Sequence, residues 1–448
     1  MTFKTPILLF AALAVLVAVS GCSDDDPAAP VSDAQTFTLT LENVSAPADY
    51  AVSGVFNTPM GAASPAPIFP DESYEFTFGA NPGDKLSFAT MFVQSNDLFY
   101  APNGDGIALF NGTTPVSGNV TAQVHLWDSG TELNEEPGVG PHQAPRQTGP
   151  NMGTVDGDMT VRRVDDMYTY PAVSSVIEVT LTHLGDHLFR ARLTNVSDGM
   201  TLMTSGGSVA VPLAPGVFVV HSGSHPLFTD GTADMLGLEG LAEDGDPSAL
   251  SASLEAHTGL AVPLAPGVAV VHSPAASLFT AGQADPGLGL QALAEDGDPS
   301  GLAAALDGVS AVSSANVFNT PAGSMGPAPI FPGERYQVTF TAEPGDRLSL
   351  ATMFVQSNDL FYAFDAAGLA LFDGMGSAVV GDVTSHLGLW DAGTEMNQWP
   401  GVGADQAPRQ SGANIGAIDA NATVRQVNDG FLYPANGDVI RVTLTLAN

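Results

Sequence analysis

Two long stretches of this 448-residue chain are nearly the same. The first copy contains VFNTPMGAASPAPIFP from Val55 and ATMFVQSNDLFYA from Ala89, and the second contains VFNTPAGSMGPAPIFP from Val317 and ATMFVQSNDLFYA from Ala351. The offset between the copies is 317 − 55 = 262 residues, whereas the units of a solenoid repeat every 20–50 residues or so. The chain therefore carries a duplicated domain, and whatever fold this domain has must occur twice.

Short segments with alternating apolar residues predict β-strands in each copy. Examples in the first copy are TFTLTLENV from Thr36, SYEFTFGA from Ser73 and KLSFATMFV from Lys85. Turn residues such as Asn81-Pro82-Gly83-Asp84 separate them, and 49 Gly and 33 Pro with only 13% charged residues also favour a turn-rich β protein. The pattern predicts an all-β fold of two antiparallel β-sandwiches.

The boundary between the two sandwiches is expected near residue 186. HLFRARLTNVS from His187 is similar to the opening strand FTLTLENVS, so we expect sandwich 1 to span 36–185 and sandwich 2 to span 186–448. A smaller tandem repeat, VPLAPGVFVVHS from Val211 and VPLAPGVAVVHS from Val262, lies inside the second. Each unit is followed by a helical pattern, so residues 211–310 or so are expected to be a tandem strand-plus-helices insertion that only sandwich 2 carries.

The helical segments contain carboxylates with two interpretations. In LAEDGDPSAL, Gly245 is typical of a helix end, and Asp246 followed by Pro247 is typical of a helix start. Glu243, Asp244 and Asp246 also resemble a cation-binding loop, but capping accounts for these residue types and is the interpretation we adopt. Asp296, Asp298 and Pro299 repeat the pattern.

The N-terminus predicts export and lipid attachment. Residues 1–22 have a basic start and an apolar run typical of a signal peptide. They end in Val19-Ser20-Gly21-Cys22, which resembles the lipobox of bacterial lipoproteins, and Cys22 is the only cysteine in the chain. We expect lipidation at Cys22, a flexible tether over 23–35, membrane attachment through this lipid, and a location at the outer membrane or cell surface.

The net charge argues against anionic partners. The chain has 12 Lys and Arg against 48 Asp and Glu, a net charge of −36. Such a field repels nucleic acid and anionic lipid surfaces and favours divalent cations and basic partners. A merely solubilising acidic surface explains the charge equally well.

The strongest candidate site is a pair of acidic loops that each copy repeats. Carboxylates from separate loops, close to glycine-containing turns, provide the hard oxygen ligands that Ca²⁺ prefers. Alternatively, Asp128 and Asp391 only cap a turn, while the tryptophans that precede them fill the end of the sandwich. The candidate metal ligands are Asp97, Asp128 and Glu132 in the first copy, and Asp359, Asp391 and Glu395 in the second.

Other polar residues are weaker candidates. Arg146 and Arg409, in the repeated QAPRQ, are expected either to pair with the acidic loops or to bind a carboxylate of a partner. His221 and His225 have a zinc-like spacing but lie on a glycine-containing segment, so we interpret them as surface histidines.

The acidic loops also carry a family resemblance. WDAGTE from Trp390 and WDSGTE from Trp127, each preceded by QSNDLFY, resemble the W-D-A-G-T-[DE] motif and the P-S-x-D-x-F loop of the spondin N-terminal domain, known from the animal matrix proteins F-spondin and mindin. The resemblance implies a C2-like β-sandwich that binds one calcium ion in each copy, through Asp97, Asp128 and Glu132 in the first and Asp359, Asp391 and Glu395 in the second, and a role in adhesion. This chain lacks the cysteines of the animal members.

From these observations we expect a non-enzymatic, lipid-anchored cell-envelope protein whose two spondin-like domains bind calcium and an extracellular protein or glycan. One alternative is a carbohydrate-active hydrolase that uses Asp128 and Glu132 as its paired carboxylates. Another is a purely structural surface or biofilm component.

Overall fold

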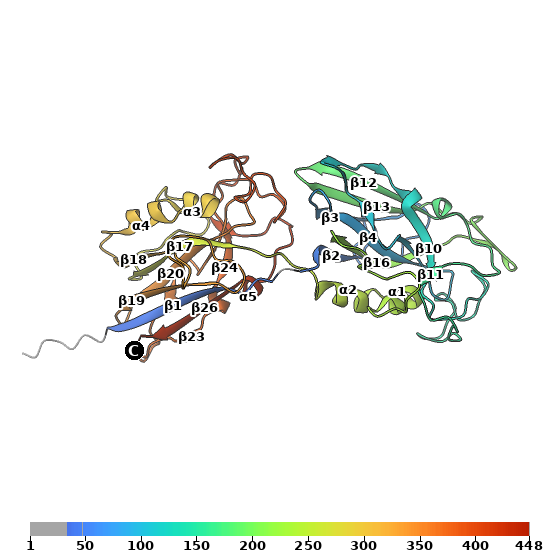
Figure 1. Ribbon diagram of the computed structural model, residues 1–448, viewed down its shortest axis with the longest axis horizontal. Coiled ribbons are helices and arrows are strands. Elements are labelled where there is room, and N and C mark those ends of the chain that lie inside the picture. The colour runs from blue at the N-terminus through green and yellow to red at the C-terminus, as the bar shows by residue number, and fades with distance from the viewer. Residues whose placement is uncertain (1–33, 47, 448) are drawn as a thin grey trace, which may run out of the picture.

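The chain forms two β-sandwich lobes that lie side by side (Figure 1). The computed structural model describes residues 34–46 and 48–447. Lobe 1 consists of residues 50–256, and lobe 2 consists of residues 34–45 and 260–447. The predicted signal peptide, the lipidation site Cys22 and nearly all of the predicted tether lie outside the described residues. No helix among the residues described is long and apolar enough to cross a membrane.

Lobe 1 packs two antiparallel sheets face to face. The larger has the strand order β11-β10-β5-β4-β16-β2, with β6 also paired to β4. Its strands are β11 (Arg162–Arg163), β10 (Val124–Asp128), β5 (Leu98–Pro102), β4 (Lys85–Phe92), β16 (Leu213–His221), β2 (Tyr50–Phe56) and β6 (Ile107–Ala108). The smaller sheet is β3 (Ser73–Gly79), β13 (Leu188–Asn195), β12 (Ile177–Gly185) and β9 (Gly118–Asn119), in that order.

Lobe 2 repeats this arrangement. Its larger sheet has the order β18-β17-β20-β21-β24-β25, with β22 also paired to β20. These strands are β18 (Val312–Phe318), β17 (Leu264–His272), β20 (Arg347–Phe354), β21 (Leu360–Ala363), β24 (Gly388–Asp391), β25 (Arg425–Gln426) and β22 (Leu369–Ala370). The smaller sheet is β19 (Arg335–Ala342), β1 (Gln35–Asn43), β26 (Ile440–Leu446) and β23 (Gly381–Asp382), in that order.

Short elements complete the lobes. The remaining strands form the hairpins β7 (Phe110–Asn111) with β8 (Thr114–Pro115) and β14 (Leu202–Thr204) with β15 (Gly207–Val209). The helices are α1 (Leu238–Asp244), α2 (Ser248–Glu255), α3 (Leu290–Asp296), α4 (Ser300–Leu306) and α5 (Asn436–Val439), with 3-10 turns η1 (Thr121–Gln123), η2 (Val173–Ser175) and η3 (Thr384–His386). The prediction of an all-β fold built from antiparallel sheets is confirmed.

The first strand of the chain belongs to the second lobe. β1 lies between β19 and β26, in register from Gln35 opposite Ala342 to Glu42 opposite Arg335. β13 takes the equivalent position in lobe 1, between β3 and β12. The predicted boundaries of 36–185 and 186–448 were therefore wrong. The likeness between the β1 and β13 sequences was real, but it reflects equivalent places in two lobes and not the start of a new domain.

The predicted helical insertion in the second sandwich is also wrong, because each lobe has one helix pair. Leu238, Leu241 and Leu250 of α1 and α2 pack against Phe99 and Val217 in lobe 1. The equivalent leucines of α3 and α4 pack against lobe 2. The tandem repeat is adjacent in sequence because α2 ends lobe 1 just before β17 begins the continuous part of lobe 2. Neither sandwich therefore lacks the helices.

Candidate acidic loop sites

The sheet register brings the predicted carboxylates of each lobe together. Asp97 immediately precedes β5, and Asp128 ends β10 opposite Leu98. The Ser129 amide donates to the Asp97 carbonyl at 3.2 Å. In lobe 2, Asp391 lies opposite Leu360 in the same way. The two loops of each pair thus meet at one end of their sheet, as the calcium hypothesis requires.

Asp97 is the most deeply buried carboxylate of the lobe 1 cluster. Its side chain is 0% exposed. Oδ2 accepts hydrogen bonds from the Thr131 amide at 2.8 Å, the Glu132 amide at 3.0 Å and the Ser129 hydroxyl at 3.0 Å. Oδ1 has no hydrogen-bond partner within the described residues. Burial raises the pKa of Asp97, because water no longer stabilises the charged form.

Asp359 repeats this arrangement in lobe 2. Oδ2 accepts from the Thr394 amide at 2.7 Å and the Glu395 amide at 3.0 Å, and Oδ1 again has no partner in the part of the chain that is described. Burial raises the pKa of Asp359 too. A buried carboxylate oxygen without a partner is costly, so its occurrence in both lobes points to a positive group that this oxygen is placed to meet.

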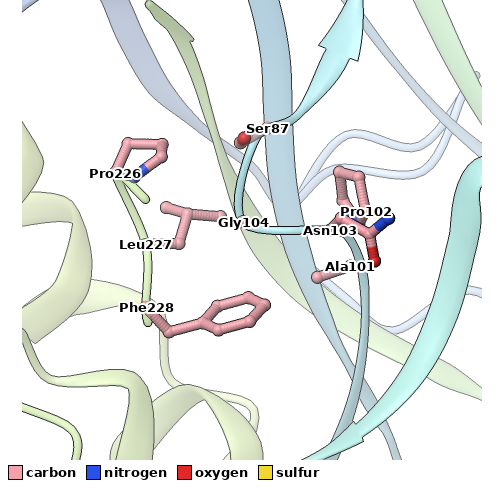
Figure 2. Close-up of a pocket in the computed structure, with 8 residues that line it drawn as sticks. All are labelled: Ser87, Ala101, Pro102, Asn103, Gly104, Pro226, Leu227 and Phe228. Carbon is pink, nitrogen blue, oxygen red and sulfur yellow. The ribbon is translucent and has the colours of Figure 1, made fainter. Parts of the chain in front are cut away.

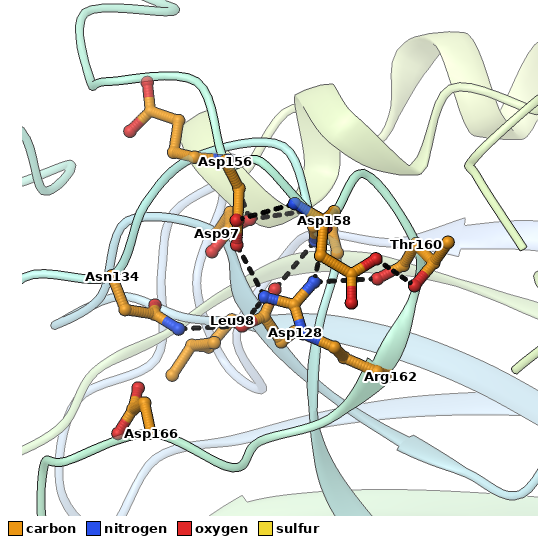
Figure 3. Close-up of polar contacts among 12 residues, drawn as sticks. Asp97, Leu98, Asp128, Asn134, Asp156, Asp158, Thr160, Arg162 and Asp166 are labelled. Carbon is orange, nitrogen blue, oxygen red and sulfur yellow. Dashed lines mark hydrogen bonds and ion pairs between the residues drawn. The ribbon is translucent and has the colours of Figure 1, made fainter. Parts of the chain in front are cut away.

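Asp128 is held by both a turn and an arginine (Figure 3). Oδ1 accepts from the Gly130 amide at 2.7 Å, and Oδ2 accepts from Asn134 Nδ2 at 2.7 Å and Arg162 Nη2 at 3.1 Å. Burial, followed by the nearby charge of Asp97, raises the pKa of Asp128 to about 7. The same causes raise the pKa of Asp391 to about 7. The turn capping that we considered as an alternative is therefore present, but it leaves the charge of the cluster incompletely compensated.

Glu132 completes the predicted set. Its side chain is 4% exposed, Oε1 accepts from the Gly153 amide at 2.5 Å, and Oε2 accepts from Asn96 Nδ2 at 3.2 Å. Glu395 makes the equivalent contacts with Gly416 and Asn358. These glutamates tie a third loop, around residue 153 or 416, to the acidic cluster.

A glutamate that the sequence analysis had attributed to helix capping also belongs to the cluster. Glu243, in the last turn of α1, is 2% exposed. Burial, together with the charges of Glu132, Glu239 and Asp97, raises its pKa to about 8, although a hydrogen bond with Thr131 opposes the shift. Capping is correct for Asp246, whose Oδ1 accepts from the Ser248 amide at 3.0 Å, but it was the wrong reason to set Glu243 aside.

The lobe 2 counterpart of this glutamate is Glu295 in α3. It is 1% exposed, and its Oε2 has no partner within the chain as described. Burial raises its pKa, as do the charges of Glu395 and Asp359. The signal that could have identified Glu243 and Glu295 is the identity of the LAEDGDPS segment in both tandem units.

The cations of the clusters are Arg162 and Arg425, which the sequence interpretation missed. Arg162 Nη2 lies 3.1 Å from Asp128 and 2.5 Å from Asp156, and Arg425 pairs in the same way with Asp391 at 2.7 Å and with Asp419. Arg146 instead donates to the Gly140 carbonyl at 2.8 Å and to Gln94 Oε1 at 3.1 Å. The expectation that Arg146 and Arg409 pair with the acidic loops was therefore wrong.

No protein-family model matches the chain, and no curated protein matches it either. The spondin resemblance therefore depends on the loop motifs alone.

The clusters contain the ligand types of a calcium site but not its coordination geometry. Among residues 34–46 and 48–447, no group of three or more His, Cys, Asp and Glu side chains is arranged to hold a metal ion. The donors are all oxygens, as Ca²⁺ requires, and unpaired Asp97 Oδ1 and Asp359 Oδ1 are available to one. The residue types therefore suit a calcium ion, but the side chains as they lie, with Glu132 bonded to Gly153 and Asn96, do not form a coordination shell.

The prediction of surface histidines is wrong for His221. This residue is 1% exposed, and its Nε2 lies 2.9 Å from Ser87 Oγ. His272 and Ser349 form the same pair at 2.8 Å. The other ring nitrogen of each histidine faces a backbone carbonyl, not a carboxylate. The shallow pocket beside Ser87, bordered by Asn103 and the segment 226–228 (Figure 2), has no space for a water molecule. Each pair therefore makes a buried hydrogen bond between two neighbouring strands of its larger sheet.

Proposed function

We propose that this chain is a non-enzymatic, lipid-anchored cell-envelope protein whose two lobes each bind one calcium ion at the acidic loops. The proposal depends on one observation: the buried Asp97 Oδ1 and its counterpart Asp359 Oδ1 both lack a partner within the described residues and lie inside acidic clusters. The same costly arrangement occurs in both copies, and a buried unsatisfied group calls for an explanation, which a bound cation would supply.

The ion would be held by carboxylates from separate elements. In lobe 1 these are Asp97 and Glu132 from the loops and Glu243 from α1, with Asp128 bordering them. In lobe 2 the ligands would be Asp359, Glu395 and Glu295, bordered by Asp391. The ion would supply positive charge, and so would favour the ionised form of carboxyl groups whose pKa values burial now raises.

The wider role follows from the predicted anchor and from the loops. Lipid attachment at Cys22 would hold the protein at the outer membrane or cell surface. The calcium-stiffened loops would then be presented to an extracellular protein or glycan, as the spondin resemblance implies for adhesion.

A hydrolase using Asp128 and Glu132 is a weaker candidate. These side chains are 2% and 4% exposed, and backbone amides and Arg162 occupy their oxygens. A catalytic acid and its partner must reach both the glycosidic oxygen and the sugar ring, which favours a binding role for these residues.

Isothermal titration calorimetry with CaCl₂ tests the proposal. The titrated protein is the chain from residue 23 onward with the anchor removed. We expect saturable binding at two sites, one site after Asp97→Asn, and none after Asp97→Asn with Asp359→Asn. The exposed Asp105 provides a matched control, because Asp105→Asn removes the same charge away from the cluster. Absence of heat with the unaltered chain, or equal loss with the control, would reject the calcium sites.

A further inference from the structure

The N-terminal strand is an essential internal strand of a lobe to which it is joined only indirectly. β1 is paired along its whole length on both sides, with β19 and with β26. Its inward residues Phe37, Leu39 and Leu41 are at most 1% exposed and belong to the core of lobe 2. Asn43 Nδ2 donates to the carbonyls of Val262 at 2.8 Å and Ile330 at 2.9 Å. Without β1, lobe 2 would expose two strand edges and part of its core.

Lobe 1, by contrast, contains all of its own strands. Its equivalent internal strand, β13, follows β12 directly through a tight turn and pairs with β12 and β3. β1 is linked on its C-terminal side to lobe 1, through residues 44–49, and reaches the remainder of lobe 2 only after all of lobe 1. In chain order, the protein therefore consists of β1, then the complete lobe 1, and then the remainder of lobe 2, which has no internal strand of its own at the position of β1.

Side-chain volume matches each strand to its own slot. In lobe 1 the central inward residue of the strand is Ala191, which lies opposite Phe76. In lobe 2 the equivalent residue is Leu39, which lies opposite Val338. A small residue thus meets a large one in lobe 1, and the sizes are exchanged in lobe 2. Since extra volume in a packed core is costly, β1 does not fit the lobe 1 slot in place of β13.

Charge on the outer face makes the same distinction. Arg190 Nε and Arg192 Nη2 of β13 lie 3.1 Å and 2.8 Å from Glu75 of β3. The equivalent residues of β1 are Thr38 and Thr40, and Gln337 takes the place of Glu75. β1 is therefore a specific strand ligand for the slot between β19 and β26.

We propose that the lobe 2 slot also accepts β1 from a second copy of this chain, so that copies are linked by exchanged N-terminal strands. Such an exchange keeps the pairing of β1 with β19 and β26 and the bonds of Val44 and Ser45 to Val439 and Val262, and it changes the chain path only after Ser45. Strand exchange of this kind is a low-cost route to oligomers. Synthesis order favours it, because 335 − 43 = 292 positions separate the end of β1 from the start of β19. β1 is thus made long before its partners, and while lobe 2 of another copy is still folding its slot can take up this strand.

Cysteine pairs on separate chains test this proposal. Thr38 and Thr339 are opposite each other, with their hydroxyls 3.4 Å apart, and Cys22→Ser leaves the full chain without other thiols. One chain carries Thr38→Cys, the other carries Thr339→Cys, and the two are co-expressed and exported together. We expect a reducible dimer on a denaturing gel, at twice the mass of one chain.

The matched control uses the equivalent pair in lobe 1, Arg190 and Thr77. Arg190→Cys and Thr77→Cys on separate chains should give no dimer, because β13 lies within its own lobe. A third chain carrying both Thr38→Cys and Thr339→Cys checks the register, since thiol labelling should find its cysteines oxidised. Two results would each overturn the proposal: no dimer from the lobe 2 pair while the third chain closes, or a third chain whose cysteines stay free.

Discussion

The raised pKa values of Asp128 and Asp391 predict a pH dependence whose direction calcium should reverse. Burial raises both values from 3.8 to about 7. Between these two values the folded chain binds more protons than the unfolded chain, so the free energy of unfolding must fall as the pH rises from 4 to 7 or so. Without calcium, each lobe should therefore be most stable in acid and lose this contribution near neutrality.

The size of the effect follows from the shift. A change of 7 − 3.8 = 3.2 pKa units corresponds to about 4 kcal/mol per aspartate, at about 1.36 kcal/mol per unit. For lobes of this size, 1 kcal/mol moves the melting temperature by about 2–4 °C, so the full contribution is on the order of 10 °C. The proposed calcium ions would bind the ionised carboxylates, so calcium should raise the melting temperature at pH 7.5 and have little effect at pH 4.

The assay is thermal unfolding followed by circular dichroism from pH 4 to pH 8, with EDTA and with CaCl₂. The variant Asp128→Asn with Asp391→Asn isolates these two groups, because asparagine does not titrate and the remaining charge of the chain is unchanged. In EDTA, the unaltered chain should lose stability relative to the variant as the pH rises, because asparagine resembles the neutral aspartic acid and does not ionise. An unaltered chain that gains stability relative to the variant with rising pH, or a difference that does not depend on pH, would refute the assignment of raised pKa values to these aspartates.

Three further substitutions test how the clusters and the strand slot are built. Gly130→Ala should destabilise lobe 1 more than Gly112→Ala in urea unfolding. Both glycines have a positive φ, of 74° and 64°, but only at Gly130 would a Cβ meet a backbone carbonyl oxygen, at 2.5 Å. Equal losses of stability in the two variants would contradict this. Leu39→Ala should cost about 2–5 kcal/mol by leaving a cavity in the lobe 2 core, measured by the same method, and a loss below 1 kcal/mol or so would mean that β1 is not packed there. Arg162→Met should destabilise lobe 1 by about 1–3 kcal/mol through loss of a charged hydrogen bond to Asp128, and stronger calcium binding in calorimetry should accompany the loss; unchanged stability would show that the ion pair is unimportant.

The strands could be predicted from the sequence because their signal is local. The alternation in TFTLTLENV gave a half-buried strand, and β1 has that burial pattern, with Phe37, Leu39 and Leu41 inward. The partners of a strand are not local. Phe37 to Asn43 pair with residues close to the C-terminus, and alternation is the same whichever sheet supplies the neighbours. The division of the chain into lobes was therefore beyond a pattern read along one segment.

The residues of the candidate site also differ in whether their sequence signal is local. Asp97, Asp128 and Glu132 could be selected because they lie in short repeated motifs at the ends of predicted strands. Arg162 and Glu243 could not be selected so directly, since they reach the cluster from β11 and α1, which are distant in the sequence. Glu243 also had a sufficient local explanation as part of a helix end. A local explanation accounts for a residue type, but it does not exclude a second use of the side chain in the folded protein.

The duplication nevertheless contained the information that a single copy lacked. β1 and β13 are similar enough to mark equivalent positions, yet they differ at Leu39 and Ala191, and their neighbours Val338 and Phe76 differ in the opposite sense. Paired changes of this kind are expected between residues that touch in a close-packed core. Comparing the copies position by position therefore provides a signal, separate from alternation, that favours pairing Leu39 with Val338 and Ala191 with Phe76, and so β1 with the second lobe. Exchanging the two pairs of residues tests this reasoning: Leu39→Ala with Val338→Phe should be tolerated better in urea unfolding than Val338→Phe alone, because the new ring then occupies the space that the leucine leaves.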